Sequence, residues 1–160
     1  MTDLDVIGVK IDERAPTDTV FEKITNYSKE NNCFVQIFDP EMVVGKDHLL
    51  WAIEKAKSRF EDDENRADSL EMEILLCSSG ERQIKNAIKK MGLKDMSDKA
   101  AVVTNCDTDG LLDHIGWERD DDILVPSIDK LKNYGVSEIE IGSTDKPFDL
   151  VFEIMATSEI

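Results

Sequence analysis

Apolar residues recur along this chain with two spacings, one typical of strands and one typical of helices. Residues 4–11 are expected to form a strand, because apolar and polar side chains alternate there. Residues 33–38 and 100–106 are apolar runs that predict two further strands. The apolar run from Ile74 to Cys77 stands before a Ser-Ser-Gly turn, and it predicts a short buried strand.

Helical spacing marks the segments between these runs. Pro16 is expected to open one helix, and residues 46–60 predict the longest, with apolar side chains three and four residues apart. Residues 127–134 predict a further helix that stops at a glycine. The last helix is expected to be capped by Asp145, with Pro147 in its first turn.

One more helix is expected directly after the buried run. Ser78 and Glu81 have the spacing of a capping box, in which both side chains bind backbone donors of the first turn. Gly92 is expected to end this helix in a Schellman motif. Its apolar positions predict a core-facing side made of Ile84, Ala87, Ile88 and Met91. The exposed side is then cationic and carries Arg82, Lys85, Lys89 and Lys90.

The order of these elements predicts the fold class. Strands and helices alternate irregularly and no glycine-rich phosphate loop follows a strand, which favours an α+β fold over a doubly wound nucleotide-binding fold. We expect a small mixed or antiparallel sheet with packed helices. The 160 residues, of which 41% are hydrophobic, suit a single domain spanning residues 1–160.

The formal net charge of −16 narrows the possible partners. Such an acidic chain is a poor non-specific binder of nucleic acid, so any RNA contact has to be local. No apolar stretch is long enough to span a bilayer and no signal peptide is evident, so a cytoplasmic protein with no membrane partner is expected. Cys33, Cys77 and Cys106 are odd in number and far apart, and they predict reduced core thiols rather than disulfides.

Few residues suggest catalytic or metal chemistry. His48 and His114 have no ligands at metal spacing, and we expect them to be structural or surface residues. Asp107, Asp109 and Asp113 imitate the first half of an EF-hand loop, although the position of the final glutamate is a glycine. An acidic turn is therefore expected, and the alternative is a small calcium- or metal-binding protein, or a metal-dependent enzyme, that uses this loop.

Three passages carry a family resemblance. The first, residues 38–56, contains Asp-Pro, Gly-Lys and His-Leu pairs at the entry to the long helix. The second, residues 73–88, contains Gly-x-Arg-Gln-Ile from Gly80 to Ile84, and the third is the tail, residues 141–160. Together they resemble the small regulatory, kinase-binding subunit of the KEOPS complex in its archaeal form, and the second passage is the most specific. That complex makes the threonylcarbamoyladenosine modification of transfer RNA.

The resemblance implies a non-catalytic adaptor with an α+β fold and no cofactor. It would bind and stimulate the small atypical kinase/ATPase subunit, hold the single-stranded 3′ CCA end of transfer RNA, and meet other KEOPS subunits only indirectly. A protein-interaction module without an RNA role is a further possibility.

The resemblance and the charge pattern together give the candidate site residues. The nucleic-acid candidates are Arg82, Gln83, Ile84, Lys85 and Lys89, with Lys46 and Lys55 added from charge alone. The candidates for contact with the kinase are Phe148, Val151, Phe152 and Met155 of the last helix, together with Phe21 and Ile24. The simpler interpretations are a solvated helix face for the first set and a core stripe for the second.

Overall fold

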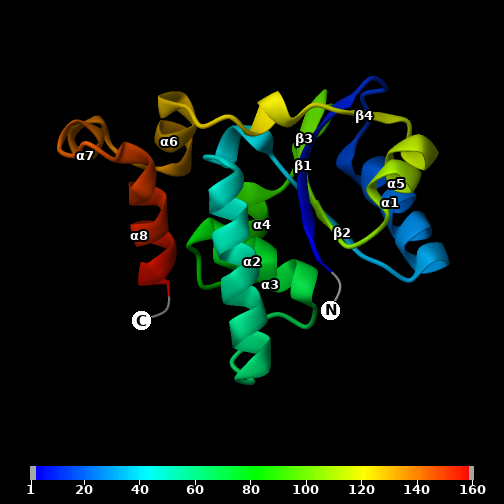
Figure 1. Cartoon of the computed structure of the whole chain (residues 1–160), viewed down its shortest axis with the longest axis horizontal. Coiled ribbons are helices and arrows are strands. Elements are labelled where there is room, and N and C mark those ends of the chain that lie inside the picture. The colour runs from blue at the N-terminus through cyan, green and yellow to red at the C-terminus, as the bar shows by residue number, and fades with distance from the viewer. Residues whose placement is uncertain (1–2, 159–160) are drawn as a thin grey trace.

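A four-stranded antiparallel sheet forms the middle layer of the molecule, with strand order β2-β3-β1-β4 (Figure 1). The computed structural model describes residues 3–158. The strands are β1 Asp5–Ile11, β2 Val35–Phe38, β3 Lys99–Thr104 and β4 Trp117–Arg119. The central strands are held in register by the pairing of Val102 with Ile7 on one side and with Ile37 on the other.

Helices cover both faces of this sheet. The α-helices are α1 Thr17–Asn31, α2 Lys46–Glu61, α3 Leu70–Ser79, α4 Ile84–Met91, α5 Thr108–Ile115, α6 Ile128–Tyr134, α7 Glu138–Gly142 and α8 Leu150–Thr157. Short 3-10 turns are η1 Pro40–Met42, η2 Asp121–Leu124 and η3 Pro147–Asp149. In Figure 1, α1 and α5 lie on one side of the sheet, and α2, α3, α4 and α8 lie on the other.

The core divides according to the alternation of side chains along the strands. On β3, Ala101 and Val103 join the cluster formed with α2, α3 and α8. Their neighbours Ala100 and Val102 face the other way and join the cluster that includes α1 and α5. The α+β class and the antiparallel sheet expected from the sequence are therefore confirmed.

The predicted strand at residues 74–77 is wrong, because these residues lie inside α3. Ser69 is the N-cap of that helix, and its hydroxyl accepts a hydrogen bond from the backbone N–H of Met72. Every residue from Glu73 to Ser79 is buried, so α3 is enclosed on all sides. A helix without a polar face has no 3.6-residue alternation, and a short apolar run cannot then be distinguished from a buried strand.

The predicted capping box is also wrong. Ser78 lies in the last turn of α3, where its hydroxyl donates to the carbonyl of Leu75 at 2.7 Å. The helix α4 begins only at Ile84, so Arg82 and Gln83 belong to the turn that precedes it. Gly92 does end α4 as expected, but its φ of −68° excludes the left-handed Schellman geometry.

Two further details at the helix surfaces differ from expectation. Ile88 on α4 is 48% exposed instead of facing the core, and Ile84 is only half-buried. Asp145 caps no helix, because the 3-10 turn η3 starts at Pro147 and leads directly into α8.

The expectation of three reduced core thiols is wrong for two of the cysteines. Cys33 and Cys106 form a disulfide with a Cα–Cα distance of 5.1 Å, whereas Cys77 is buried outside it. The sheet explains the pairing, since Val35 on β2 lies opposite Thr104 on β3 and the disulfide joins the residues two positions beyond each. A separation of 73 residues in the sequence gave no sign of this proximity.

Reducing this disulfide is expected to lower the free energy of unfolding by about 2–4 kcal/mol, because the cross-link restricts a long loop in the unfolded chain. Urea unfolding with and without dithiothreitol measures the difference. The double variant Cys33→Ser/Cys106→Ser is the control, and its stability should not respond to the reductant. Equal stability of the unsubstituted protein in both conditions would contradict the prediction.

Between residues 3 and 158, no helix is long and apolar enough to cross a bilayer.

Candidate functional site

The turn between α3 and α4 is pressed against the C-terminal part of the chain. Gly80 ends α3 with a φ of +72°, a conformation that favours glycine. A Cβ atom at this position would lie 3.0 Å from the Cγ2 atom of Ile154 and 3.3 Å from the hydroxyl of Tyr134. Any other residue at the first position of the Gly-x-Arg-Gln-Ile motif would therefore be strained, which gives a structural reason for the glycine.

A buried hydrogen-bond network fixes the end of α3 from behind. The carbonyl of Ser78 accepts from His48 Nε2 at 2.8 Å and from the Tyr134 hydroxyl at 2.7 Å. The other ring nitrogen of His48, Nδ1, accepts from the backbone N–H of Val44 at 3.0 Å, which defines a neutral ring with its proton on Nε2. His48 is thus a satisfied structural histidine, as the sequence indicated.

Burial controls the charge of this network. It lowers the pKa of His48 to about 4 and raises the pKa of the Tyr134 phenol, so both stay neutral near pH 7. Lys90 also turns inward, donates from Nζ to the carbonyl of Ser79 at 2.9 Å and lies 3.7 Å from the centre of the Tyr134 ring. Burial lowers its pKa as well. Lys90 therefore stabilises the turn and is not part of the exposed cationic surface.

A polar hollow of about 420 Å³ opens beside this turn, and we call it the Arg82 hollow. It is lined by Gly80, Glu81, Arg82, Gln83, Asn86, Thr157 and Ser158. Arg82 and Gln83 are exposed, and within residues 3–158 their side chains make no hydrogen bond or ion pair. Cations elsewhere are often engaged, as Lys99 is with Glu41 at 3.0 Å. The hollow therefore presents free donors on an otherwise acidic protein.

The lysines predicted to bind nucleic acid lie on two helices, α4 and α2. Lys85 and Lys89 are exposed on α4, which continues directly from the turn. Lys46 lines a different groove at the start of α2. Lys55 is half-buried further along α2 and does not line the Arg82 hollow.

Sequence reasoning missed three residues of the hollow. Asn86 could have been found, because it lies in the first turn of α4, three positions after Gln83. Thr157 and Ser158 could not, because only the packing of α8 against the turn brings them there.

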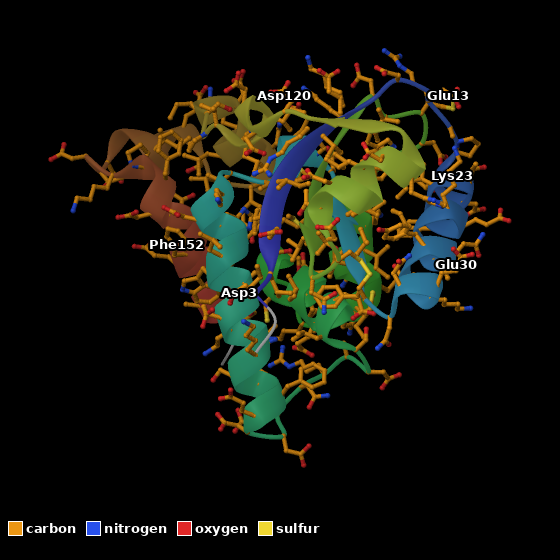
Figure 2. All side chains as sticks on the ribbon, turned by 45° about the vertical axis from the view of Figure 1, so that its right-hand side comes forward. Asp3, Glu13, Lys23, Glu30, Asp120 and Phe152 are labelled. Atoms are coloured by element: carbon orange, nitrogen blue, oxygen red, sulfur yellow. A yellow bond between two sulfur atoms is a disulfide. The ribbon has the colours of Figure 1, made fainter. Side chains whose placement is uncertain are left out.

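A second hollow of about 380 Å³ lies between the start of α2 and the start of α8, and we call it the α2–α8 groove. Its lining residues are Val44, Gly45, Lys46, Asp47, His48, Asp121, Leu124, Val125, Pro126, Phe148, Asp149, Val151 and Phe152. Three of the predicted kinase-contact residues, Phe148, Val151 and Phe152, are among them. Figure 2 shows Phe152 on α8 beside α2, where its ring centre lies 6.5 Å from that of Trp51.

The other three predicted kinase-contact residues lie elsewhere. Met155 is fully buried in the core between α8 and its neighbours. Ile24 is buried on α1, and Phe21 on the same helix is 42% exposed. In Figure 1, α1 and α8 lie on opposite sides of the sheet, so the two predicted sets do not form one surface.

The acidic loop of the metal-binding alternative starts a helix. Asp107 caps α5 by accepting from the backbone N–H of Gly110 at 3.0 Å, and Asp109 and Asp113 lie exposed on that helix. Across the described range 3–158, no three carboxylate, histidine or cysteine side chains come together as metal ligands would. The alternative is not supported.

The structure thus defines a small α+β protein that carries the Arg82 hollow and the α2–α8 groove on its surface. This chain belongs to the family described as kinase binding protein CGI-121, whose family model matches residues 13–146. It is similar to the regulatory protein Cgi121 of Methanocaldococcus jannaschii, with 37% identity over 99 residues, or 59% of this chain. The chain spans 63% of the length of that relative. The family resemblance seen in the sequence is confirmed.

Proposed function

We propose that this protein is a non-catalytic regulatory subunit of the KEOPS complex, forming one domain over residues 1–160. In this role it binds and stimulates the small atypical kinase/ATPase subunit and holds the 3′ CCA end of transfer RNA. The family description and the relative's name support the kinase-binding and regulatory parts. The observation that carries the RNA part is the Arg82 hollow, where unpaired donors gather on a chain of net charge −16.

The groups in the Arg82 hollow suit a single-stranded RNA end. The guanidinium of Arg82 offers a planar cation for a phosphate or for stacking on a base, and the Gln83 amide offers a donor and an acceptor for a base edge. Ile84 is half-buried next to them and provides an apolar surface for a stacked base. Lys85 and Lys89 extend the positive charge along α4 for the preceding phosphates.

The acidity of the chain fits this local contact. Because most of the surface repels phosphate, RNA binds only where cations gather. The RNA contact and the kinase contact do not each need high affinity. Kinase and RNA bound to one small scaffold raise each other's effective concentration. The chemistry of the modification belongs to the partner subunits.

The variant Arg82→Glu is expected to lower transfer RNA modification by the reconstituted complex on the order of tenfold, since it replaces a charge-assisted contact with repulsion. Lys23→Glu is the matched control, because Lys23 is an exposed cation on α1 (Figure 2). Both variants should keep their circular dichroism spectrum and their affinity for the kinase. Unchanged modification by the Arg82 variant would remove the hollow from the mechanism.

A comparison of intact transfer RNA with transfer RNA that lacks its CCA end distinguishes this proposal from the alternative, a protein-interaction module with no RNA role. The proposal expects the intact RNA to increase ATP hydrolysis by the assembled subunits more than the truncated RNA does. Kinase binding with equal effects of the two RNAs would favour the interaction module.

A further inference from the structure

The Cys33–Cys106 disulfide joins one accessible cysteine to one enclosed cysteine. Cys33 is half-buried and lines a polar hollow of about 450 Å³ beside the end of α1, which we call the Cys33 hollow. Cys106 does not line this hollow, and only 6% of its surface is exposed. Thiol–disulfide exchange begins when a thiolate attacks a sulfur atom that it can reach. Cys33 is therefore the cysteine open to attack from solution.

The other groups in the Cys33 hollow suit thiolate chemistry. Lys29, in the last turn of α1, brings a positive charge that attracts an incoming thiolate and stabilises a thiolate at Cys33. Ser28 also lines the hollow, and its buried hydroxyl has no hydrogen-bond partner among residues 3–158. That hydroxyl is a donor available to a sulfur anion. The remaining lining residues are Asn32, Phe34 and Asn105.

Hydrogen bonds beside the disulfide hold the two chain segments together independently of it. The backbone N–H of Phe34 donates to Asn105 Oδ1 at 2.8 Å, and the Thr104 hydroxyl donates to the carbonyl of Phe34 at 2.7 Å. The backbone N–H of Cys106 donates to the same hydroxyl at 3.0 Å. The Phe34 carbonyl lies 3.5 Å from Cys106 Sγ, where it can accept from a reduced thiol. Reduction therefore leaves the two thiols close to each other, and the bond can form again.

The disulfide ties α1 to α5. Cys33 comes two residues after the end of α1, and Cys106 comes two residues before the start of α5. The ring centres of Tyr27 on α1 and His114 on α5 lie 5.1 Å apart, and Tyr27 and Leu111 form a small buried cluster with Cys106. The helices α3 and α4, which frame the Arg82 hollow, lie on the other face of the sheet (Figure 1). Opening the disulfide should therefore loosen α1 and α5 without disturbing that hollow.

We propose that this disulfide is a reversible redox site, at which a dithiol reduces the Cys33–Cys106 bond and loosens α1 from α5. One thiolate of the dithiol attacks Cys33 Sγ and forms a mixed disulfide, while Cys106 leaves and takes a proton from water. The second thiolate of the dithiol attacks its own sulfur in the mixed disulfide and releases Cys33. The dithiol is oxidised to a disulfide, and the protein gains two electrons and two thiols. Such reductants are present where the proposed function places the protein, because cytoplasmic dithiols keep most cysteines reduced.

Reduction of the folded protein by dithiothreitol tests the redox site. Thiols are counted by alkylation and mass spectrometry, and hydrogen exchange is compared between the oxidised and the reduced protein. We expect complete reduction without urea and re-formation of the bond with oxidised glutathione. Exchange should rise about tenfold or more at the end of α1 and the start of α5, and not in α4. Reduction only in denaturing urea would overturn the redox site, and an equal rise in α4 would overturn the local loosening.

The variant Lys29→Glu tests whether the attack takes place in the Cys33 hollow. Because a negative charge there repels the thiolate of dithiothreitol, reduction should be about threefold slower or more at low salt, and the difference should shrink at high salt. Lys23→Glu is the matched control, since Lys23 is an exposed cation on the same helix that does not line this hollow. Equal rates for the two variants would overturn the assignment to Cys33. These measurements need neither the kinase nor transfer RNA, so their failure is distinct from a failure of the proposed function.

Discussion

Replacing Glu73 with alanine is expected to lower the free energy of unfolding by about 3–5 kcal/mol, because it breaks a buried ion pair from one side. Glu73 is fully buried on α3, and its Oε2 atom lies 2.8 Å from Nη1 of Arg59 on α2. Its Oε1 atom accepts from the backbone N–H groups of Arg66 and Ala67 at 2.7 and 2.8 Å. The variant would leave a buried guanidinium without this carboxylate and would leave those two backbone donors without their acceptor.

Urea unfolding followed by circular dichroism measures the loss. Glu71→Ala is the matched control, since Glu71 is a half-buried glutamate in the same helix, and we expect it to cost less than about 1 kcal/mol. If Glu73→Ala costs no more than Glu71→Ala, the ion pair does not stabilise the contact between α2 and α3.

The second large effect is a loss of stability as the pH falls from about 6.5 to 4, caused by His48. Its pKa is near 6.5 in the unfolded chain and about 4 in the folded protein, because burial disfavours the charged ring. Between these values the unfolded state binds a proton that the folded state does not. The contribution of His48 to the free energy of unfolding is therefore fully present above pH 6.5. It decreases as the pH falls, and at pH 4 the decrease is about 3 kcal/mol.

The variant His48→Gln tests the assignment, because an amide can accept from Val44 and donate to Ser78 but does not titrate in this range. The free energy of unfolding, measured at several pH values, should decrease between pH 6.5 and 4 for the unsubstituted protein and much less for the variant. Carboxylates with lowered pKa values, such as Asp121, act at lower pH. Parallel pH profiles for the two proteins would show that His48 is not the cause.

Sequence patterns predicted the elements that have one buried and one exposed face. The helices α1 and α2 are examples, since both carry exposed polar residues opposite a buried side. The patterns failed for α3, where burial on every side removed the alternation, and for the capping box, where the serines bond within their own helix. Local sequence also held no information on the Cys33–Cys106 disulfide, which depends on the pairing of β2 with β3.

The candidate site could be predicted only in part, because some of its residues are close in the sequence and others meet only in the folded protein. Arg82 and Gln83 were found because the motif that positions them is continuous in the sequence. The contribution of Thr157 and Ser158 to the Arg82 hollow depends on tertiary packing. Likewise, Val125 gave no signal, because the apolar groove it borders forms only when three distant segments meet.

In the proposed function, this chain couples the kinase subunit to the end of transfer RNA. The most direct measurement is ATP hydrolysis by the matching kinase subunit, with and without this protein, in the presence of transfer RNA that has or lacks its CCA end. We expect stimulation of ATP hydrolysis that requires this protein and is greater with the intact CCA end. Binding of neither partner, or a hydrolysis rate unaffected by this protein with either RNA, would contradict it.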